Sequence, residues 1–424
     1  MTTSPATAPS SREGMWRELL PPGRRYLALP TRRHPVVVAE DRAPVLSYVR
    51  QSLLAIPPPM PGWLYPAARA ALAVPALPRI LPGLAVTAED AGAAPPDEAL
   101  DDLGRLTATG PVVLLDHSHD PAARLLLLVF PPGSPDPATA VKIPTGPHAA
   151  QSILREAERL GALARLPLGA ARPTVPTVQG LLRHGDLPAL ATTALPGVSM
   201  LVAYHRPGHH ARPGPVRADF AAAAHWLADL QSATAGAPAP LDLRPGVVET
   251  LDGRLPRPAR VHLHALRRRL RAHRAPRTAV HGDFWPGNLL VGHGRISGVV
   301  DWEHARSAGS PLADPARFIV SYCEYLDRRT RPGHRVPGHH GLIAGRPGAA
   351  LVYALHGTGW YPRLVRDFLA AAVHRLGLPV ACGRDAVLAE LAAVAAEATD
   401  PRFAQAQDRA FTVLLAAEEV PWPS

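Results

Sequence analysis

The sequence predicts an α+β fold, with a β-rich first lobe that carries one prominent helix and a mainly helical second lobe. In the first half of the chain, apolar runs of strand length alternate with turn residues. From residue 198 onward, apolar side chains recur at helical spacing. A polar loop and a hairpin interrupt the helical region at 279–303. The resulting division is an extension at 1–95, a first lobe at 96–196 and a second lobe at 197–424.

The extension offers few signals. Residues 1–20 are polar and lack the apolar segment of a signal peptide, so we expect them to be disordered. Residues 25–50 indicate two short strands followed by a helix, and a proline-rich apolar stretch continues to residue 95. The extension is therefore expected either to pack on the first lobe or to form a small recognition module.

The first lobe is predicted from its apolar runs and from one amphipathic segment at 149–165. Glu156 lies on this helix between apolar neighbours and is expected to face inward, whereas Glu158 is expected to face solvent. The predicted strands are 112–115, 125–130, 139–143 and 187–193.

The composition singles out two residues. Lysine and arginine together number 45, yet Lys142 is the single lysine, and Asn288 is the single asparagine. A coding bias against AT-rich codons explains why lysine and asparagine are rare, but it does not explain the positions of the two that are present. Lys142 lies in a strand that reads Ala-Val-Lys-Ile, like the phosphate-binding strand of kinases. Arginine cannot easily replace it, because a planar guanidinium differs from a compact ammonium aimed at phosphates.

Two further nucleotide-binding segments, a phosphate-covering loop and a hinge, are predicted from weaker patterns. No G-x-G-x-x-G motif precedes Lys142, so the candidates for a phosphate-covering loop are Gly104 and Gly110, although turn positions would explain both glycines equally well. Thr107 and Thr109 are possible donors in the same loop. The run 187–193 ends before Leu-Pro-Gly, which predicts a hinge where Thr193 and Leu195 offer backbone groups to an adenine edge. An ordinary strand end would look the same. 

The loop and hairpin at 279–303 carry the chemistry. Asp283 opens the loop, Asn288 follows five positions later, and two apolar runs joined by a Gly-His-Gly-Arg turn lead to Asp301. A hairpin of this length should bring Asp301 back close to Asn288. Two acids and an amide at one place suit phosphoryl transfer, which needs a base for a hydroxyl and oxygen ligands for Mg²⁺.

The second lobe is otherwise predicted as helices. Asp314 is expected to cap a helix or to brace the loop. The histidine-containing segments around His209 and His339 are expected to be surface loops, since they lack the spacing of a metal site. The helices are predicted at 219–234, 261–274, 360–374, 385–397 and 403–418, and the segment 310–327 is predicted as a turn followed by a helix.

The loop reads HGDFWPGNLL and is followed by VVDWE, a pair of motifs that resembles the aminoglycoside phosphotransferase and choline-kinase-like family of small-molecule kinases. The resemblance spans 99–330 and implies a bilobal, protein-kinase-like fold. It also implies Asp283 as catalytic base, with His281 in the catalytic loop as its brace, and Asn288 and Asp301 as Mg²⁺ ligands. Lys142, held by Glu156, would then bind the α- and β-phosphates of ATP. Glu303 could approach the metal or the substrate, and a surface ion pair would explain it equally well.

The expected activity is an ATP- and Mg²⁺-dependent transfer of phosphate to a hydroxyl of a small molecule. The alternative is a nucleotide-binding pseudokinase or scaffold without transfer, which the missing glycine motif leaves open. A protein kinase is disfavoured because no A-P-E segment follows Asp301. The acceptor could be an aminoglycoside, an amino alcohol, a sugar, a ketosamine or a natural product.

Bulk properties limit the partners. The net charge of +10 includes an arginine-rich helix at 262–274, but no aromatic interleaving or nucleic-acid motif accompanies it, so no specific nucleic-acid partner is expected. No apolar run reaches membrane-spanning length, and two cysteines indicate no disulfide framework. We therefore expect a cytoplasmic protein without a membrane partner. The sequence does not distinguish a monomer from an oligomer.

Overall fold

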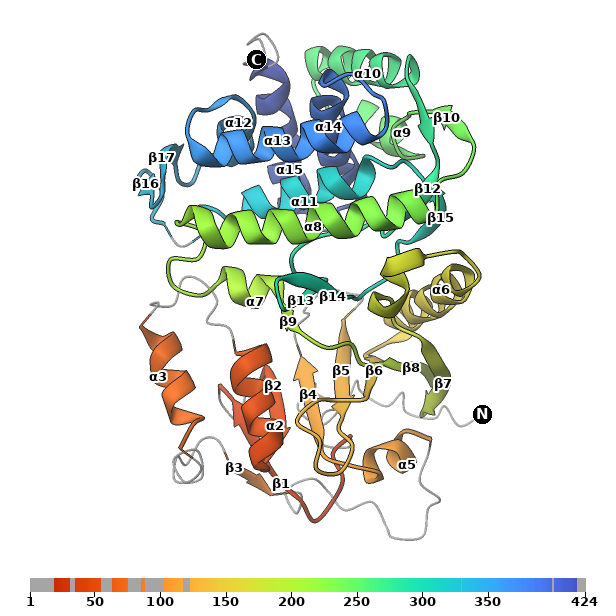
Figure 1. The fold of residues 1–424 in the computed structure, drawn as a ribbon, viewed down its shortest axis with the longest axis vertical. Helices are drawn as coiled ribbons and strands as arrows, with labels where there is room; N and C mark the ends of the chain where they lie inside the picture. Colours follow the sequence, from red (N-terminus) through yellow and green to blue (C-terminus); the bar gives the residue numbers. More distant parts are fainter. Residues whose placement is uncertain are drawn as a thin grey trace, which may run out of the picture. The chain divides into compact units, whose positions relative to one another are not determined.

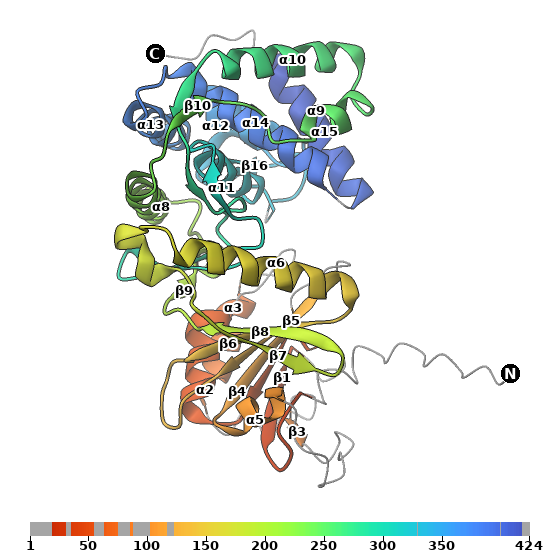
Figure 2. The same ribbon diagram turned by 90° about the vertical axis from the view of Figure 1, so that its right-hand side faces the viewer.

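The computed structural model separates the chain into two compact units (Figures 1 and 2). The first contains the described residues of 1–54, 63–164 and 176–198, and the second those of 165–175 and 199–424. The structure describes residues 19–30, 35–54, 63–74, 85–87, 102–116, 123–328, 330–398 and 400–417.

The first unit is built on a sheet of eight strands among the described residues, in the order β3-β1-β2-β4-β5-β6-β8-β7. Neighbouring strands are antiparallel in each pairing from β1 to β8. The strands are β1 (Arg25–Leu29), β2 (Val37–Glu40), β3 (Ala85–Thr87), β4 (Val112–Asp116), β5 (Arg124–Val129), β6 (Thr139–Pro144), β7 (Val178–His184) and β8 (Leu187–Thr193). The region before residue 96 thus contributes three strands to the same sheet as the lysine strand β6.

Alternation along the strands gives this sheet two buried faces. On β4, Val112 and Leu114 belong to one apolar cluster, while Val113 and Leu115 belong to the other. The first cluster includes Leu103 of α5, and the second includes Val45 of α2. The helical elements of this unit are α2 (Ala43–Tyr48), a π-helical turn (Val49–Leu53), α3 (Leu64–Ala71), α5 (Asp102–Ala108) and α6 (Pro147–Ala164).

The second unit is mainly helical, and α14 lies at its centre. This helix contacts α9, α10, α11, α13 and α15, so its buried residues are found on every side. After the short strand β9 (Val198–Ser199), the helices are α7 (Met200–Tyr204), α8 (Pro213–Ala233), α9 (Val247–Asp252), α10 (Arg257–Arg271), α11 (Ala313–Glu324), α12 (Ala349–His356), α13 (Trp360–Arg375), α14 (Ala381–Glu397) and α15 (Pro401–Ala416). A 3₁₀ turn (Gly169–Thr174), which comes earlier in the sequence, belongs to the same unit.

Short strands of the second unit position the loop of interest. The strand β12 (Thr278–Val280) leads into the loop and pairs with β15 (Arg306–Gly309). The hairpin after the loop consists of β13 (Leu289–Gly292) and β14 (Arg295–Val299). His293 and Gly294 both have positive φ in the turn between them, which suits a two-residue hairpin. The remaining strands are β10 (Pro238–Pro240), β11 (Arg274–Pro276), β16 (Arg335–Val336) and β17 (His339–Ile343).

The predicted α+β fold is confirmed, with a β-rich unit that carries one long helix and a mainly helical unit. The expected helices of the second lobe are present with shifted ends, while β7, α5, α9 and α12 were not predicted. The boundaries at 95 and 196 stay predictions. Residues 1–18 of the segment predicted to be disordered, and most of the proline-rich stretch up to residue 95, lie outside the described residues. For Leu19 and Leu20 the prediction is wrong, because both are buried in the apolar cluster that includes Leu103.

One prediction about the histidine segments is wrong. His339 is fully buried on β17, and His210 is buried as well, because the two stack in an aromatic cluster with their ring centroids 6.2 Å apart. The Nε2 atom of His339 lies 2.9 Å from the carbonyl oxygen of His210. Burial lowers the pKa of His339, so the ring packs as a neutral group. Both side chains are core residues rather than surface-loop residues.

Candidate active site

The candidate loop begins where the backbone turns sharply after β12. Gly282 has a φ of +85°, and a Cβ atom there would lie 2.3 Å from the carbonyl oxygen of His304. A glycine is therefore required for both conformation and space. Phe284, on the far side of Asp283, is fully buried and stacks on Trp226 with ring centroids 5.0 Å apart. Asp283 is thus held between a tight turn and an aromatic anchor.

Asp314 of α11 fixes the backbone of this turn. Its Oδ2 accepts the N–H of His281 at 2.7 Å, and its Oδ1 accepts the N–H of Gly282 at 2.9 Å. Asp314 is 2% exposed, and burial raises the pKa of its carboxyl group, although the two backbone N–H groups lower it in part. The sequence predicts that Asp314 either caps a helix or braces the loop. The structure shows the brace, since the N-cap of α11 is Leu312.

His281 supports the loop from within. The backbone N–H of Asp283 donates to Nδ1 of His281 at 3.2 Å, and Nε2 lies 2.9 Å from the carbonyl oxygen of Val300. A neutral ring with its proton on Nε2 satisfies both contacts. The ring is fully buried and packs against Trp302, with centroids 4.6 Å apart. These contacts connect the start of the loop to the end of β14, where Asp301 follows.

The carboxylate of Asp283 is oriented through both of its oxygens. Oδ1 accepts a hydrogen bond from Nε of Arg317 on α11 at 2.8 Å. Oδ2 accepts one from Nδ2 of Asn288 at 3.2 Å. A carboxylate has about four acceptor sites, so these bonds set its direction and still leave capacity for a hydroxyl. The side chain is 24% exposed, which is the access a general base requires.

The hairpin returns Asp301 to the neighbourhood of Asn288, as the sequence predicts. The carbonyl oxygen of Asn288 accepts the N–H of Val300 at 2.9 Å, and Asp301 is the next residue. Asp301 has a φ of +71°, a left-handed conformation that few non-glycine residues adopt. Such backbone conformations cluster at functional sites because surrounding contacts enforce them.

The donor set at this point fits Mg²⁺. Asn288 directs its amide N–H groups to the carbonyl and Oδ2 atoms of Asp283, so the amide Oδ1 faces away from that residue. An amide oxygen and the Asp301 carboxylate are hard ligands, and Mg²⁺ is commonly bound through one or two such groups plus water and phosphate oxygens. Within the described ranges, no group of three or more His, Cys, Asp or Glu side chains is arranged to hold a metal.

A network of buried charges lies beneath the loop. Arg244 donates to both oxygens of Glu390 on α14, at 2.6 and 2.8 Å, and to Glu397 at 2.9 Å. The same guanidinium lies 3.4 Å from the carbonyl oxygen of Gly282. Glu390 is 3% exposed, and burial raises its pKa to about 7 even though Arg244 and Arg317 act to lower it. Arg244 thus connects the loop to two acids of α14.

The structure also brings together Lys142 and Glu156 in the first unit. The Nζ atom of Lys142 on β6 lies 2.6 and 2.5 Å from the two carboxylate oxygens of Glu156 on α6. Glu156 is 2% exposed, whereas Glu158 on the same helix is exposed. The inward orientation expected for Glu156 is therefore observed.

The other candidate nucleotide contacts have local structural explanations. A Cβ atom on Gly110 would lie 1.9 Å from the carbonyl oxygen of Phe130, so close packing requires glycine there. The hydroxyls of Thr107 and Thr109 donate to carbonyls of their own segment. Thr193 accepts the N–H of Thr177 on its hydroxyl oxygen. The nucleotide contacts of Gly110, Thr193 and Leu195 stay predictions.

Sequence reasoning missed Arg317, Arg244 and Glu390. A signal for Arg317 exists, since it follows Asp314 by three positions on α11 and the two side chains share one helix face. On a helix whose other neighbours are apolar, such a polar pair points to a buried polar partner. Arg244 and Glu390 are 146 positions apart, and no local pattern relates them.

Comparison with known proteins identifies one family. The model of the phosphotransferase enzyme family matches residues 133–351, which include Lys142 and the whole loop-hairpin segment. Among curated proteins, none matches the chain in sequence.

Solved structures with similar folds include the following three, each at low sequence identity. A thermostable mutant of the aminoglycoside phosphotransferase APH(4)-Ia, in complex with ADP and hygromycin B, is 13% identical, with a TM-score of 0.46 over 73% of this chain and 95% of that chain. A choline/ethanolamine kinase family protein from Mesorhizobium loti is 18% identical, with a TM-score of 0.41 over 76% and 92%. The aminoglycoside phosphotransferase APH(2")-IIa, with streptomycin and ATP, is 15% identical, with a TM-score of 0.42 over 76% and 98%.

Proposed function

The chain belongs to the phosphotransferase enzyme family, and we propose that it transfers the γ-phosphate of ATP, with Mg²⁺, to a hydroxyl of a small molecule. The observation that carries this proposal is the arrangement around Asp283. One carboxylate, oriented through both oxygens by Arg317 and Asn288, lies in a loop whose single asparagine neighbours a second acid across a hairpin. A structural aspartate would need neither the second acid nor the remaining acceptor capacity.

In this proposal Asp283 positions the acceptor hydroxyl and receives its proton as the oxygen attacks phosphorus. Asn288 and Asp301 would hold the metal through an amide oxygen and a carboxylate. Bound Mg²⁺ would offset the negative charge of the phosphates. Lys142, held by Glu156, would bind the α- and β-phosphates as a point charge. His281 and Asp314 would act on the geometry of the loop rather than on the substrate.

The test is a screen of hydroxylated acceptors for an ATP-dependent mass gain of one phosphoryl group. The panel covers aminoglycosides, amino alcohols, sugars and ketosamines. Asp283→Asn keeps the shape of the side chain but removes the base, so we expect transfer to fall at least about a hundredfold, the lower range for general acid–base catalysis. Binding of ATP should persist in this variant.

Asp367→Asn is the matched control, because Asp367 is exposed on α13. Normal turnover by Asp283→Asn would remove the base from the proposal. Binding of ATP without transfer to any acceptor, and without hydrolysis, would favour the pseudokinase or scaffold that the missing G-x-G-x-x-G motif leaves as the competing function.

A further inference from the structure

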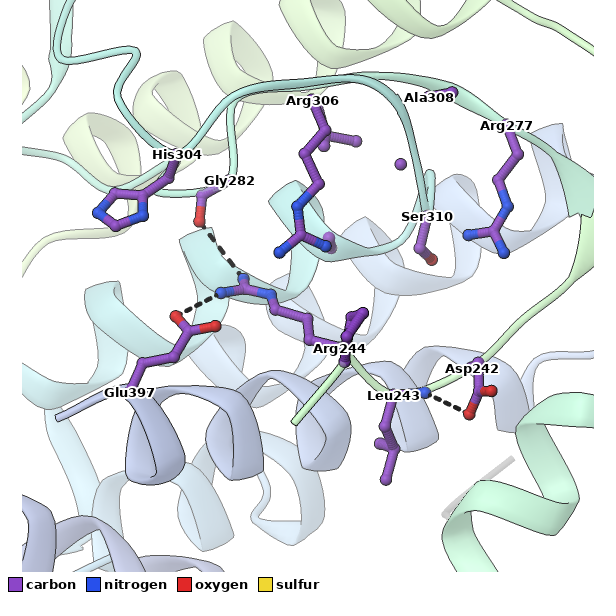
Figure 3. Close-up of a pocket in the computed structure, with 14 residues that line it drawn as sticks. Asp242, Leu243, Arg244, Arg277, Gly282, His304, Arg306, Ala308, Ser310 and Glu397 are labelled. Atoms are coloured by element: carbon purple, nitrogen blue, oxygen red, sulfur yellow. Dashed lines mark hydrogen bonds and ion pairs between the residues drawn. The ribbon is translucent and has the colours of Figure 1, made fainter. Parts of the chain in front are cut away.

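A cavity of about 420 Å³ in the second unit lies beside the candidate loop and is not used by the proposed function. Gly282 lines it, and so do Arg306 and Ser310 from the segment around β15 and Arg244 from the connection after β10 (Figure 3). Asp283 itself is not among the lining residues. The volume falls within the range of about 300–1,000 Å³ that is typical of small-molecule sites.

Positive side chains converge on this cavity from two adjoining segments. Arg277 immediately precedes β12, and Arg306 opens β15, which is paired with β12. In Figure 3 both guanidinium groups and the Ser310 hydroxyl point toward the side of the cavity that Arg244 occupies. Arg277 donates through Nη2 to the carbonyl of Pro240 at 3.0 Å, which anchors one edge of a group with five N–H donors.

Two carboxylates also line the cavity, but each already has an arginine partner. Asp242 accepts a hydrogen bond from Nε of Arg267 at 2.9 Å. Glu397 accepts one from Arg244, also at 2.9 Å. The lining thus contains three arginines, Arg244, Arg277 and Arg306, against these two carboxylates. This excess of positive side chains makes the cavity suited to an anion.

We infer that this cavity is a binding site for a small phosphate-bearing anion, separate from the γ-phosphate of the proposed reaction. Arginine forks match phosphate oxygens in paired hydrogen bonds, and a serine hydroxyl adds a neutral donor. The shared chemistry is a phosphate group, supplied either by inorganic phosphate or by a phosphorylated metabolite.

The site is placed to stiffen the loop. Thr278 pairs with Gly309 and Val280 with Arg306, so Arg277 and Arg306 lie at opposite ends of the β12–β15 ladder. A phosphate held by both arginines would tie these strands together directly before His281. Arg244 connects the cavity to the loop through the carbonyl of Gly282. A bound anion should therefore raise the unfolding temperature of the second unit.

The test measures the unfolding temperature of the full chain, without nucleotide, against inorganic phosphate and a hexose phosphate, with sodium chloride at matched ionic strength as the baseline. We expect both phosphates to raise it beyond chloride. Arg277→Gln and Arg306→Gln should each weaken the apparent affinity at least about tenfold, the cost of one charge-assisted contact. Arg277→Lys keeps the charge and should recover part of the affinity.

The control is Arg363→Gln, since Arg363 is exposed on α13 and does not line the cavity. A lower effective concentration for the hexose phosphate would identify a phosphorylated metabolite as the ligand, and equal concentrations would identify free phosphate. No shift beyond chloride, or an equal shift in the glutamine variants and the wild type, would overturn the site. Asp283→Asn should show the same phosphate-induced rise in unfolding temperature as the wild type. The phosphate site can therefore be tested even if the transferase proposal fails.

Discussion

Arg317 is the residue through which α11 reaches the candidate base. Its Nε donates to Asp283 across 34 positions of sequence, and its side chain is 19% exposed. Burial acts to lower the pKa of Arg317, but the nearby acids Asp283, Glu390 and Glu324 outweigh it and raise the pKa. The guanidinium therefore stays charged and can hold the carboxylate in one direction. We regard it as a positioning residue, because its contact is with the proposed base Asp283.

Removal of Arg317 should act on the rate of transfer more than on nucleotide binding. In Arg317→Gln we expect kcat to fall about tenfold to a hundredfold, because small displacements of a reacting group cost rates of that order. The KM for ATP should change little. Arg317→Lys retains the charge without the fork and should recover part of kcat. Steady-state kinetics with an acceptor found in the screen measures both constants.

A purely structural role for Arg317 would give a different pattern. Loss of folding would reduce the active fraction of Arg317→Gln and Arg317→Lys together, and the unfolding temperature would report it. An unchanged kcat in a folded Arg317→Gln protein would contradict the positioning role.

At the scale of elements, the loop depends on two strands that approach each other unusually closely. A Cβ atom on Gly309 of β15 would lie 2.4 Å from Cγ2 of Val280 on β12. The next constraint is Gly282, whose missing side chain lets the backbone pass the carbonyl of His304. Close approach between β12 and the segment after Asp301 keeps both acids on one short piece of scaffold.

Gly282→Ala tests this constraint, and the chain offers a matched control. Gly294 in the hairpin turn also has a positive φ, +74°, but nothing lies within 4 Å of a Cβ atom there. Gly294→Ala should therefore cost only the backbone strain, about 1 kcal/mol. Gly282→Ala adds a clash with backbone and should destabilise the second unit by clearly more, with loss of transfer. Chemical denaturation of both variants measures the difference, and equal destabilisation would show that the close contact does not constrain the loop.

A feature of this fold or site could be predicted from the sequence when the interacting residues lie close together in the chain. The hairpin, the loop and the return of Asp301 toward Asn288 are local, so turn residues and apolar periods suffice to predict them. Arg244 and Glu390 meet only because α14 crosses the second unit, and no period in the sequence encodes that meeting. The strand β7 alternates between intermediate and exposed positions and lacks a buried apolar run, which explains why it was missed.

At the scale of the whole molecule, the fold contains acids that are protonated more readily than in the unfolded chain. Burial raises the pKa of Asp314 and Glu324 on α11, and it raises that of Glu390 on α14 to about 7. An unfolded glutamate releases its proton near pH 4.5. Between these values the folded state binds more protons than the unfolded state does, so the free energy of unfolding falls as pH rises from about 4.5 to 7.

Glu390→Gln should flatten this dependence, because the amide does not titrate. The contribution of Glu390 amounts to at most about 3 kcal/mol, at about 1.4 kcal/mol for each unit of pKa. Glutamine has nearly the shape of the protonated glutamate, and its amide oxygen can still accept from Arg244, so below about pH 4.5 the variant should be about as stable as the wild type. The slope of stability against pH is therefore the informative quantity. Trp226 and Trp302, both buried in the second unit, report its unfolding by fluorescence.

Glu397→Gln separates titration from the loss of an arginine partner. Glu397 also pairs with Arg244, but it is 46% exposed, so its removal should lower stability slightly and leave the wild-type slope in place. A Glu390→Gln protein with the wild-type slope would show that Glu390 does not titrate near neutrality. Arg244 and Arg317 would then hold Glu390 ionised near neutral pH. Glu390 and Arg244 would form a permanent ion pair rather than a pair in which Glu390 exchanges its proton.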